Sequence, residues 1–197
     1  MPKVSDEYRE AKRDEIATAA MRAFVRKGFQ ATSMADIIAE SGLSAGAIYG
    51  HFAGKSQLIL AVAERVVGAR VGEIESLSNR DPQPPPAALT RILMSGMLHD
   101  IGRPSLLLQL WGEAVTDPAV QQLATQVMHQ LRGVYINYIS LWQQREHGLS
   151  PADADLVATE QSLLFISVAQ GYILQSALFD DFDSEAFLSS IEKYLPR

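Results

Sequence analysis

The 197-residue chain contains no cysteine. Disulfide frameworks, zinc–thiolate sites and cysteine nucleophiles are therefore excluded. It also lacks any apolar run near the roughly 20 residues that a membrane-spanning helix needs. Residues 1–13 are polar and charged, without the apolar stretch of a secretory signal, so we expect a cytoplasmic protein.

Strand signals are scarce, whereas apolar residues recur at helical spacing along most of the chain. With 47% hydrophobic residues the chain can also bury a substantial core. We predict an all-α fold: an N-terminal three-helix DNA-binding domain followed by a C-terminal helical bundle. The nine expected helices comprise a short one after Thr32 and the segments 8–27, 45–52, 55–77, 87–101, 105–115, 118–146, 151–179 and 184–194.

A proline-rich segment at residues 81–86 cannot lie inside a helix, and it divides the expected domains. These are a head at 1–54, a bridging helix at 55–80 and a larger domain at 81–197. Residues 1–70 hold ten Lys/Arg against eight Asp/Glu, whereas residues 71–197 hold seven against fifteen. Balances of +2 and −8 favour a DNA-binding head on an acidic remainder.

The most informative stretch, residues 32–60, is TSMADIIAESGLSAGAIYGHFAGKSQLIL. Two short helices are expected to meet at a tight turn around Gly42, with Ser33 and Asp36 forming a capping box and Ser44 capping the second helix. This is the helix-turn-helix pattern, whose second helix enters the major groove of DNA. Tyr49, His51 and Lys55 follow within that second helix and at the start of the next.

Residues 23–59, AFVRKGFQATSMADIIAESGLSAGAIYGHFAGKSQLI, closely resemble the tetracycline-repressor (TetR/AcrR) family of bacterial regulators. The matches include Gly28-Phe29, Ser41-Gly42-Leu43-Ser44 and His51-Phe52, and they cover the first third of the chain. The resemblance implies roles in DNA binding. Those implied for phosphate contacts are Thr32, Ser33, Tyr49, His51 and Lys55, and those implied near base edges are Ser44, Ala45, Gly46 and Gly50.

Two of these positions depart from the commonest family pattern, because Ala45 and Gly50 stand where larger polar residues are frequent. Small residues can contact a thymine methyl group but cannot form bidentate hydrogen bonds with a base. We therefore expect few direct base hydrogen bonds and more dependence on backbone contacts and DNA shape.

The resemblance also implies a homodimer and a small-molecule effector. In the family the last two long helices pair with those of a second subunit, so the expected interface residues are Leu163, Ser167, Val168, Gly171, Leu174, Phe187 and Ile191. Methionine and aromatic side chains after the proline-rich segment suit a mostly apolar ligand. The candidates are Met94, Met97, Leu98, Leu107, Trp111, Met128, Tyr135, Tyr138, Phe165 and Tyr172.

The expected function is that of a ligand-responsive transcriptional regulator, a repressor released from a palindromic DNA operator by a small, largely apolar molecule. A helical enzyme or metal protein has less support, because the four histidines lack metal spacing and no nucleophile-elbow motif occurs. We therefore predict no catalytic activity, metal or cofactor. A small-molecule carrier, or a helical interaction protein with a weakened DNA-binding head, remains an alternative.

Overall fold

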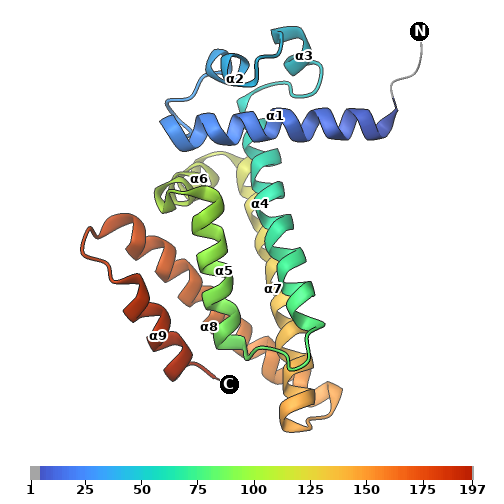
Figure 1. Cartoon of the computed structure of the whole chain (residues 1–197), viewed down its shortest axis with the longest axis vertical. Coiled ribbons are helices and arrows are strands. Elements are labelled where there is room, and N and C mark those ends of the chain that lie inside the picture. Colours follow the sequence, from blue (N-terminus) through green and yellow to red (C-terminus); the bar gives the residue numbers. More distant parts are fainter. Residues whose placement is uncertain (1–4, 197) are drawn as a thin grey trace. The chain divides into compact units, whose positions relative to one another are not determined.

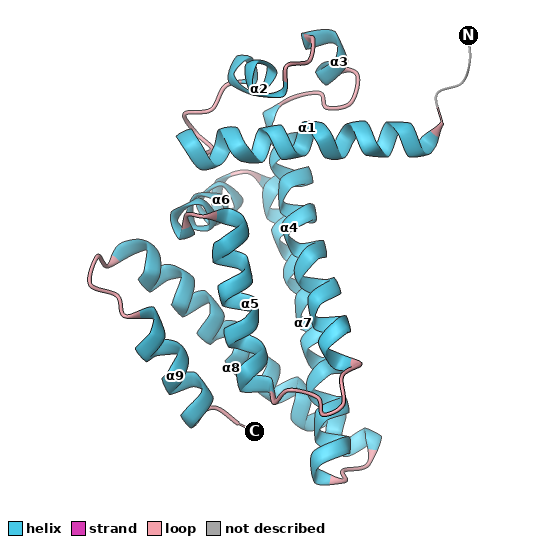
Figure 2. Cartoon of the chain, viewed as in Figure 1, coloured by secondary structure: helices cyan, strands magenta, loops and turns pink. Residues whose placement is uncertain are grey.

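The computed structural model describes residues 5–196, except the side chains of residues 98–100. The described residues form nine α-helices and no strand (Figure 2), which confirms the all-α prediction. No helix among them combines the length and the apolar character that crossing a bilayer requires. The helices are α1 (Asp6–Lys27), α2 (Met34–Ser41), α3 (Ala45–Tyr49), α4 (Lys55–Ser78), α5 (Pro86–Ile101), α6 (Pro104–Thr116), α7 (Pro118–His147), α8 (Pro151–Leu178) and α9 (Ser184–Tyr194).

Polar residues before the helices fix where the long ones begin. The Asp117 carboxylate accepts the Ala119 N–H at 2.8 Å before α7, and the Ser150 hydroxyl accepts the Asp153 N–H at 3.2 Å before α8. In both cases proline occupies the first helical position, where its missing N–H costs nothing. These starts agree with the sequence prediction.

The chain divides into two compact units, which we call the head (Met1–Arg65) and the body (Val66–Arg197). The division falls within α4, so the first half of this helix belongs to the head and the second half to the body. The proline-rich segment 81–86, where the sequence suggested a division, is therefore part of the body.

Side chains of α7 hold this proline-rich segment in place. Buried Gln83 donates its amide N–H to the Tyr138 carbonyl at 3.0 Å and accepts a hydrogen bond from Arg145 at 2.9 Å. The Tyr138 hydroxyl donates to the Pro84 carbonyl at 2.6 Å. Proline excludes helix at this segment, but the side-chain hydrogen bonds make it a fixed loop of the body.

The core of the body is built on α7 and α8, which pack along each other. Tyr138 and Phe165 are fully buried there. At the α9 end of α8, the ring of Tyr172 lies 5.4 Å from that of Phe182 and 5.5 Å from that of Phe187. Phe187 and the buried Ile191, both expected at a dimer interface, thus pack within their own chain.

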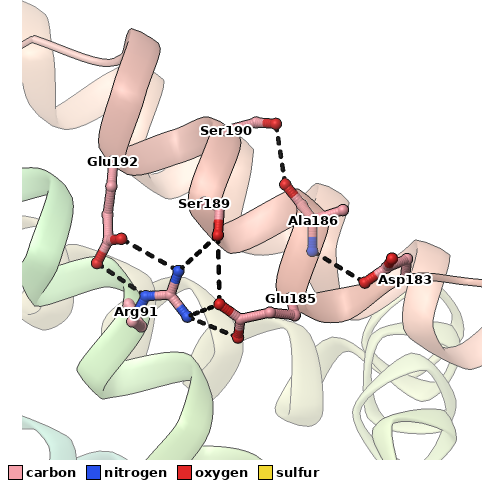
Figure 3. A network of polar contacts seen from close by, with 7 residues as sticks. All are labelled: Arg91, Asp183, Glu185, Ala186, Ser189, Ser190 and Glu192. Atoms are coloured by element: carbon pink, nitrogen blue, oxygen red, sulfur yellow. Dashed lines mark hydrogen bonds and ion pairs between the residues drawn. The ribbon is translucent and has the colours of Figure 1, made fainter.

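Helix α9 is also fastened to α5 by one cation (Figure 3). The guanidinium of Arg91 donates to Glu192 at 2.8 Å, to Glu185 at 2.8 Å and to the Ser189 hydroxyl at 3.1 Å. Because Arg91 is only 25% exposed, solvent screens these interactions less than those of a fully exposed ion pair. Arg91 therefore links α5 and α9 by charged hydrogen bonds, in addition to the aromatic packing between α8 and α9.

Replacing this cation should loosen α9. We expect Arg91→Met to lower stability by roughly 1 kcal/mol, or about 2–4 °C in Tm for a chain of this size, because two carboxylates lose their partner. Thermal unfolding followed by circular dichroism measures the change. Glu185→Gln, at a largely exposed partner, is the control and should cost less. An Arg91→Met protein as stable as wild type would contradict a fastening role.

Candidate DNA-binding site

Ion pairs with the last turns of α1 fix the position of α2. Arg22 and Arg26 both reach the carboxylate of Glu40, at 2.8 and 2.7 Å. Their hydrogen bonds lower the pKa of Glu40 below its ordinary value. The two arginines thus hold the C-terminal end of α2 against α1.

The N-terminal end of α2 is fixed by Asp36, as the capping-box pattern predicts. Asp36 accepts the Ser33 N–H at 2.9 Å, while the Ser33 hydroxyl accepts the Asp36 N–H at 3.2 Å. Lys27 also donates to Asp36 at 2.6 Å, and this interaction, with the bonds from Ser33, strongly lowers the pKa of Asp36. One carboxylate therefore serves both as a helix cap and as a tie to α1.

The turn between α2 and α3 follows the predicted chemistry. Gly42 adopts the left-handed conformation, with φ of 68°, and its N–H closes α2 on the Ile38 carbonyl. Ser44 then caps α3 by accepting the Ala47 N–H at 3.2 Å. Ile48, on the inner face of α3, is fully buried. The structure thus has the helix-turn-helix geometry that the sequence indicates (Figure 1).

Helix α3 is shorter than predicted. It ends at Tyr49, whereas the sequence predicted an end at residue 52. Gly50 has a low helix propensity, and beyond it Phe52 leaves the helix and is buried in the head. A Cβ at position 50 would lie 3.3 Å from the Gly46 carbonyl oxygen, so this position is also tight.

The predicted base-facing residues lie in α3 and at its two caps, and they are accessible. Ser44, Ala45, Gly46 and Gly50 are all exposed. Tyr49 lies among them and is 51% exposed. Apart from Ser44 and Tyr49, this surface offers no side-chain hydrogen-bonding group, as the sequence led us to expect.

Comparison with known proteins relates the sequence of this helix-turn-helix to a family of bacterial regulators. Residues 16–62 match the sequence model for bacterial regulatory proteins of the tetR family. The head of this chain is therefore similar to the TetR family. The match spans the helix-turn-helix and the start of α4, and it confirms the resemblance that the sequence suggested.

Relatives and solved structures agree with this assignment. YfiR of Bacillus subtilis, an uncharacterised HTH-type transcriptional regulator, is 38% identical over 32% of this chain, which spans only 31% of YfiR's length. TtgR of Pseudomonas putida, an HTH-type transcriptional regulator, is 26% identical over 68% of this chain and 57% of its own. A TetR-family regulator from Cytophaga hutchinsonii has the same fold, with a TM-score of 0.71 and 19% identity over 97% of this chain and 95% of its own.

Of the expected phosphate contacts in this head, Ser33 is exposed, although its hydroxyl caps α2, and three others also have structural partners. The buried Thr32 hydroxyl donates to the Gly28 carbonyl at 2.7 Å. Lys55 donates to the Phe29 carbonyl at 2.9 Å. The half-buried His51 accepts a hydrogen bond from Arg13 on its carbonyl, at 2.8 Å. These contacts order the loops beside α3, a role that the motif alone did not indicate.

Sequence reasoning also missed two arginines that tie distant parts of the head together. The guanidinium of Arg13 lies 4.4 Å from the centre of the Phe52 ring, a cation–π contact. Arg65 pairs with Asp14 and donates to the Thr18 hydroxyl at 2.7 Å, joining α4 to α1. Both pairs join residues far apart in sequence, so no local pattern signals them.

Acidification should weaken the head through Asp36 and Glu40. Both have pKa values below their ordinary ones when folded. The stability they give is therefore complete above the unfolded-state pKa of about 4 and is lost as pH falls through the lower folded-state values. In thermal unfolding between pH 6 and 2, Glu40→Gln should lose part of this pH dependence. Glu64→Gln is the control, with the same charge change at an exposed position. Parallel curves for wild type and Glu40→Gln would contradict this account.

Proposed function

We propose that this chain is a ligand-responsive transcriptional regulator that binds operator DNA as a homodimer. The observation that carries the proposal is the helix-turn-helix of the head, in which Ile48 is buried and the opposite side of α3 is exposed. That arrangement presents a recognition helix to the major groove. In a symmetric dimer two such helices would bind half-sites about 34–36 Å apart, or a multiple of this, on a palindromic operator.

The composition of α3 indicates how the operator is recognised. Ala45, Gly46 and Gly50 can approach the DNA closely and contact thymine methyl groups, but they donate no side-chain hydrogen bonds. Ser44 and Tyr49 supply the hydroxyl groups of this surface. We therefore expect phosphate contacts and sequence-dependent DNA shape to contribute most of the affinity and much of the specificity.

Removing the hydroxyl of Tyr49 should weaken DNA binding without unfolding the head. With a duplex that the protein itself enriches from randomised DNA, Tyr49→Phe should bind about three- to tenfold more weakly, the range expected for one hydrogen bond. The control is Tyr194→Phe, which removes an exposed hydroxyl in the body. Unchanged affinity of Tyr49→Phe would exclude Tyr49 as a contact, and failure to enrich any duplex would count against the proposal itself.

An exposed apolar stripe on α8 supports the homodimer. Leu156, Leu163, Leu174 and Leu178 are all exposed, at separations of seven, eleven and four residues. At 3.6 residues per turn these separations place the four side chains on one face of the helix. Exposed apolar surface of this kind marks an interaction site. Of the expected interface residues, Leu163, Ser167 and Leu174 lie exposed on this stripe, whereas Val168 and Gly171 are half-buried beside it.

A charge on this stripe should separate the subunits. Leu163→Lys should convert the dimer to a monomer in sedimentation velocity, because a dimer would bury the ammonium group without a partner. Val115→Lys is the matched control, because Val115 is an exposed apolar residue of another helix, α6. Dimers of both variants, or a monomeric wild type, would contradict an α8 interface.

The body supplies the proposed effector site, and its lining favours a largely apolar molecule. The expected ligand residues are aromatic or aliphatic, and most of those on α5, α7 and α8 lie in the core. Leu98 lies outside the described side chains. Met94, Met97, Tyr135, Tyr138, Phe165 and Tyr172 are buried, and Leu107, Trp111 and Met128 are half-buried. Effector binding would release the operator only to the extent that the effector prefers the state of the protein that does not bind DNA.

A further inference from the structure

Inside the body, polar side chains from three helices meet in surroundings that are otherwise apolar. Arg70 and Glu73 lie on α4, Thr90 on α5 and Tyr135 on α7. Arg70 and Glu73 form an ion pair, with 2.8 Å between Nη1 and Oε2, and their side chains are 14% and 30% exposed. Thr90 and Tyr135 are buried. We call these four residues the polar cluster.

Tyr135 is the member of the cluster whose hydroxyl lacks a bond. Tyr135 is 5% exposed, and its buried hydroxyl makes no hydrogen bond of good geometry with the described residues, only a weak interaction with the Thr90 hydroxyl that partly offsets the rise in its pKa. The nearby Thr90 hydroxyl is directed to the Pro86 carbonyl, 3.4 Å away. Burial, together with the negative charge of Glu73, raises the pKa of Tyr135, so its hydroxyl stays protonated and can both donate and accept. A buried hydroxyl without a partner is costly unless a ligand completes it.

The ion pair beside Tyr135 is close to neutral as a unit and is held over a glycine. A Cβ at Gly96 would overlap with the Arg70 guanidinium, so glycine at this position lets Arg70 lie against α5. The Oε2 atom of Glu73 is inaccessible to solvent. A ligand that reaches Tyr135 and Glu73 therefore meets a hydroxyl and a carboxylate whose charge is already balanced by Arg70.

The helix faces beside the polar cluster are apolar or aromatic. Thr90, Met94 and Met97 are separated by four and three residues, so they share one buried face of α5. Tyr135 and Tyr138 share a buried face of α7 in the same way. Methionine and aromatic side chains adapt readily to an aromatic or alkyl group.

We infer that the polar cluster binds the hydroxyl group of a small, amphipathic effector, whose apolar part lies against the Met94 and Tyr138 faces of α5 and α7. The inference rests on the proposed function, in which the body binds an effector. It specifies in addition which polar group that effector carries. A hydroxyl group can accept from Tyr135 and donate to Glu73 at once. A carboxylate or an ammonium would lose its hydration without gaining a counter-ion, because Arg70 and Glu73 already pair with each other.

The probes that test this inference share a phenylpropyl tail. Phenylbutanol, phenylbutyrate, phenylbutylamine and butylbenzene carry a hydroxyl, a carboxylate, an ammonium or no polar group. Isothermal titration of the 197-residue protein should give the tightest binding for phenylbutanol, about tenfold over the others, as one well-placed hydrogen bond allows. Equal or tighter binding of phenylbutyrate or phenylbutylamine, or no binding of phenylbutanol, would overturn the inference.

Tyr135→Phe separates ligand binding from a structural role. Because its hydroxyl makes no hydrogen bond of good geometry in the free protein, its removal should leave Tm unchanged or raise it, while phenylbutanol binding weakens about tenfold and butylbenzene binding does not change. Tyr194→Phe is the control and should change neither. A lower Tm with unchanged phenylbutanol affinity would show that the hydroxyl is structural and would overturn the inference.

A second variant tests the balance of charge. Glu73→Gln removes the carboxylate charge beside Arg70, so phenylbutyrate should bind it about tenfold more tightly than it binds wild type. Unchanged phenylbutyrate affinity would count against the cluster as the site. Binding of operator DNA, measured on the same samples, keeps the two proposals apart: DNA binding without a hydroxyl preference overturns only this inference, whereas a hydroxyl preference without DNA binding overturns only the regulator.

Discussion

The burial of Ile48 is the constraint on which the proposed DNA recognition depends. Helix α3 has five residues, too few to be stable alone in water. Its position is set from outside: Ile48 anchors its inner face, Ser44 caps its start, and Phe52 returns the chain to the core of the head. The ion pairs of Glu40 and Asp36 with α1 then fix α2, against which the turn is built. The outer side of α3 is left with small residues and Tyr49.

The ion pairs of the head and the Arg70–Glu73 pair of the body lie in different surroundings. In the head most of the ion pairs lie near the surface, and they hold short helices that have little core of their own. In the body the Arg70–Glu73 pair lies against a buried tyrosine, where the lower dielectric strengthens every polar interaction and makes an incomplete one costly. Because α4 runs through both units, the helix that carries this pair also carries Arg65, which contacts α1 in the head.

Local patterns in the sequence predicted much of this structure. Helix caps and starts depend on residues three or four apart, so Ser33, Asp117 and Ser150 could be assigned from the sequence. Long-range contacts could not be assigned in this way. Nothing near Gln83 shows that its amide binds α7, and nothing near Thr32 shows that its hydroxyl is buried. Tyr135 was among the expected ligand residues, but the polar cluster around it was missed, because nothing near Tyr135 in the sequence shows that Arg70 and Glu73 of α4 lie beside it.

The most direct test of the account is the affinity of the purified protein for the intergenic DNA upstream of its own gene. Fluorescence anisotropy on this duplex and on a scrambled one, at several salt concentrations, compares specific with non-specific binding. We predict clear selectivity for the upstream duplex, with log K falling linearly with log salt by about 0.9 for each phosphate neutralised. Equal binding of both duplexes at every salt concentration would contradict the claim that α3, as Ile48 positions it, recognises a DNA sequence there.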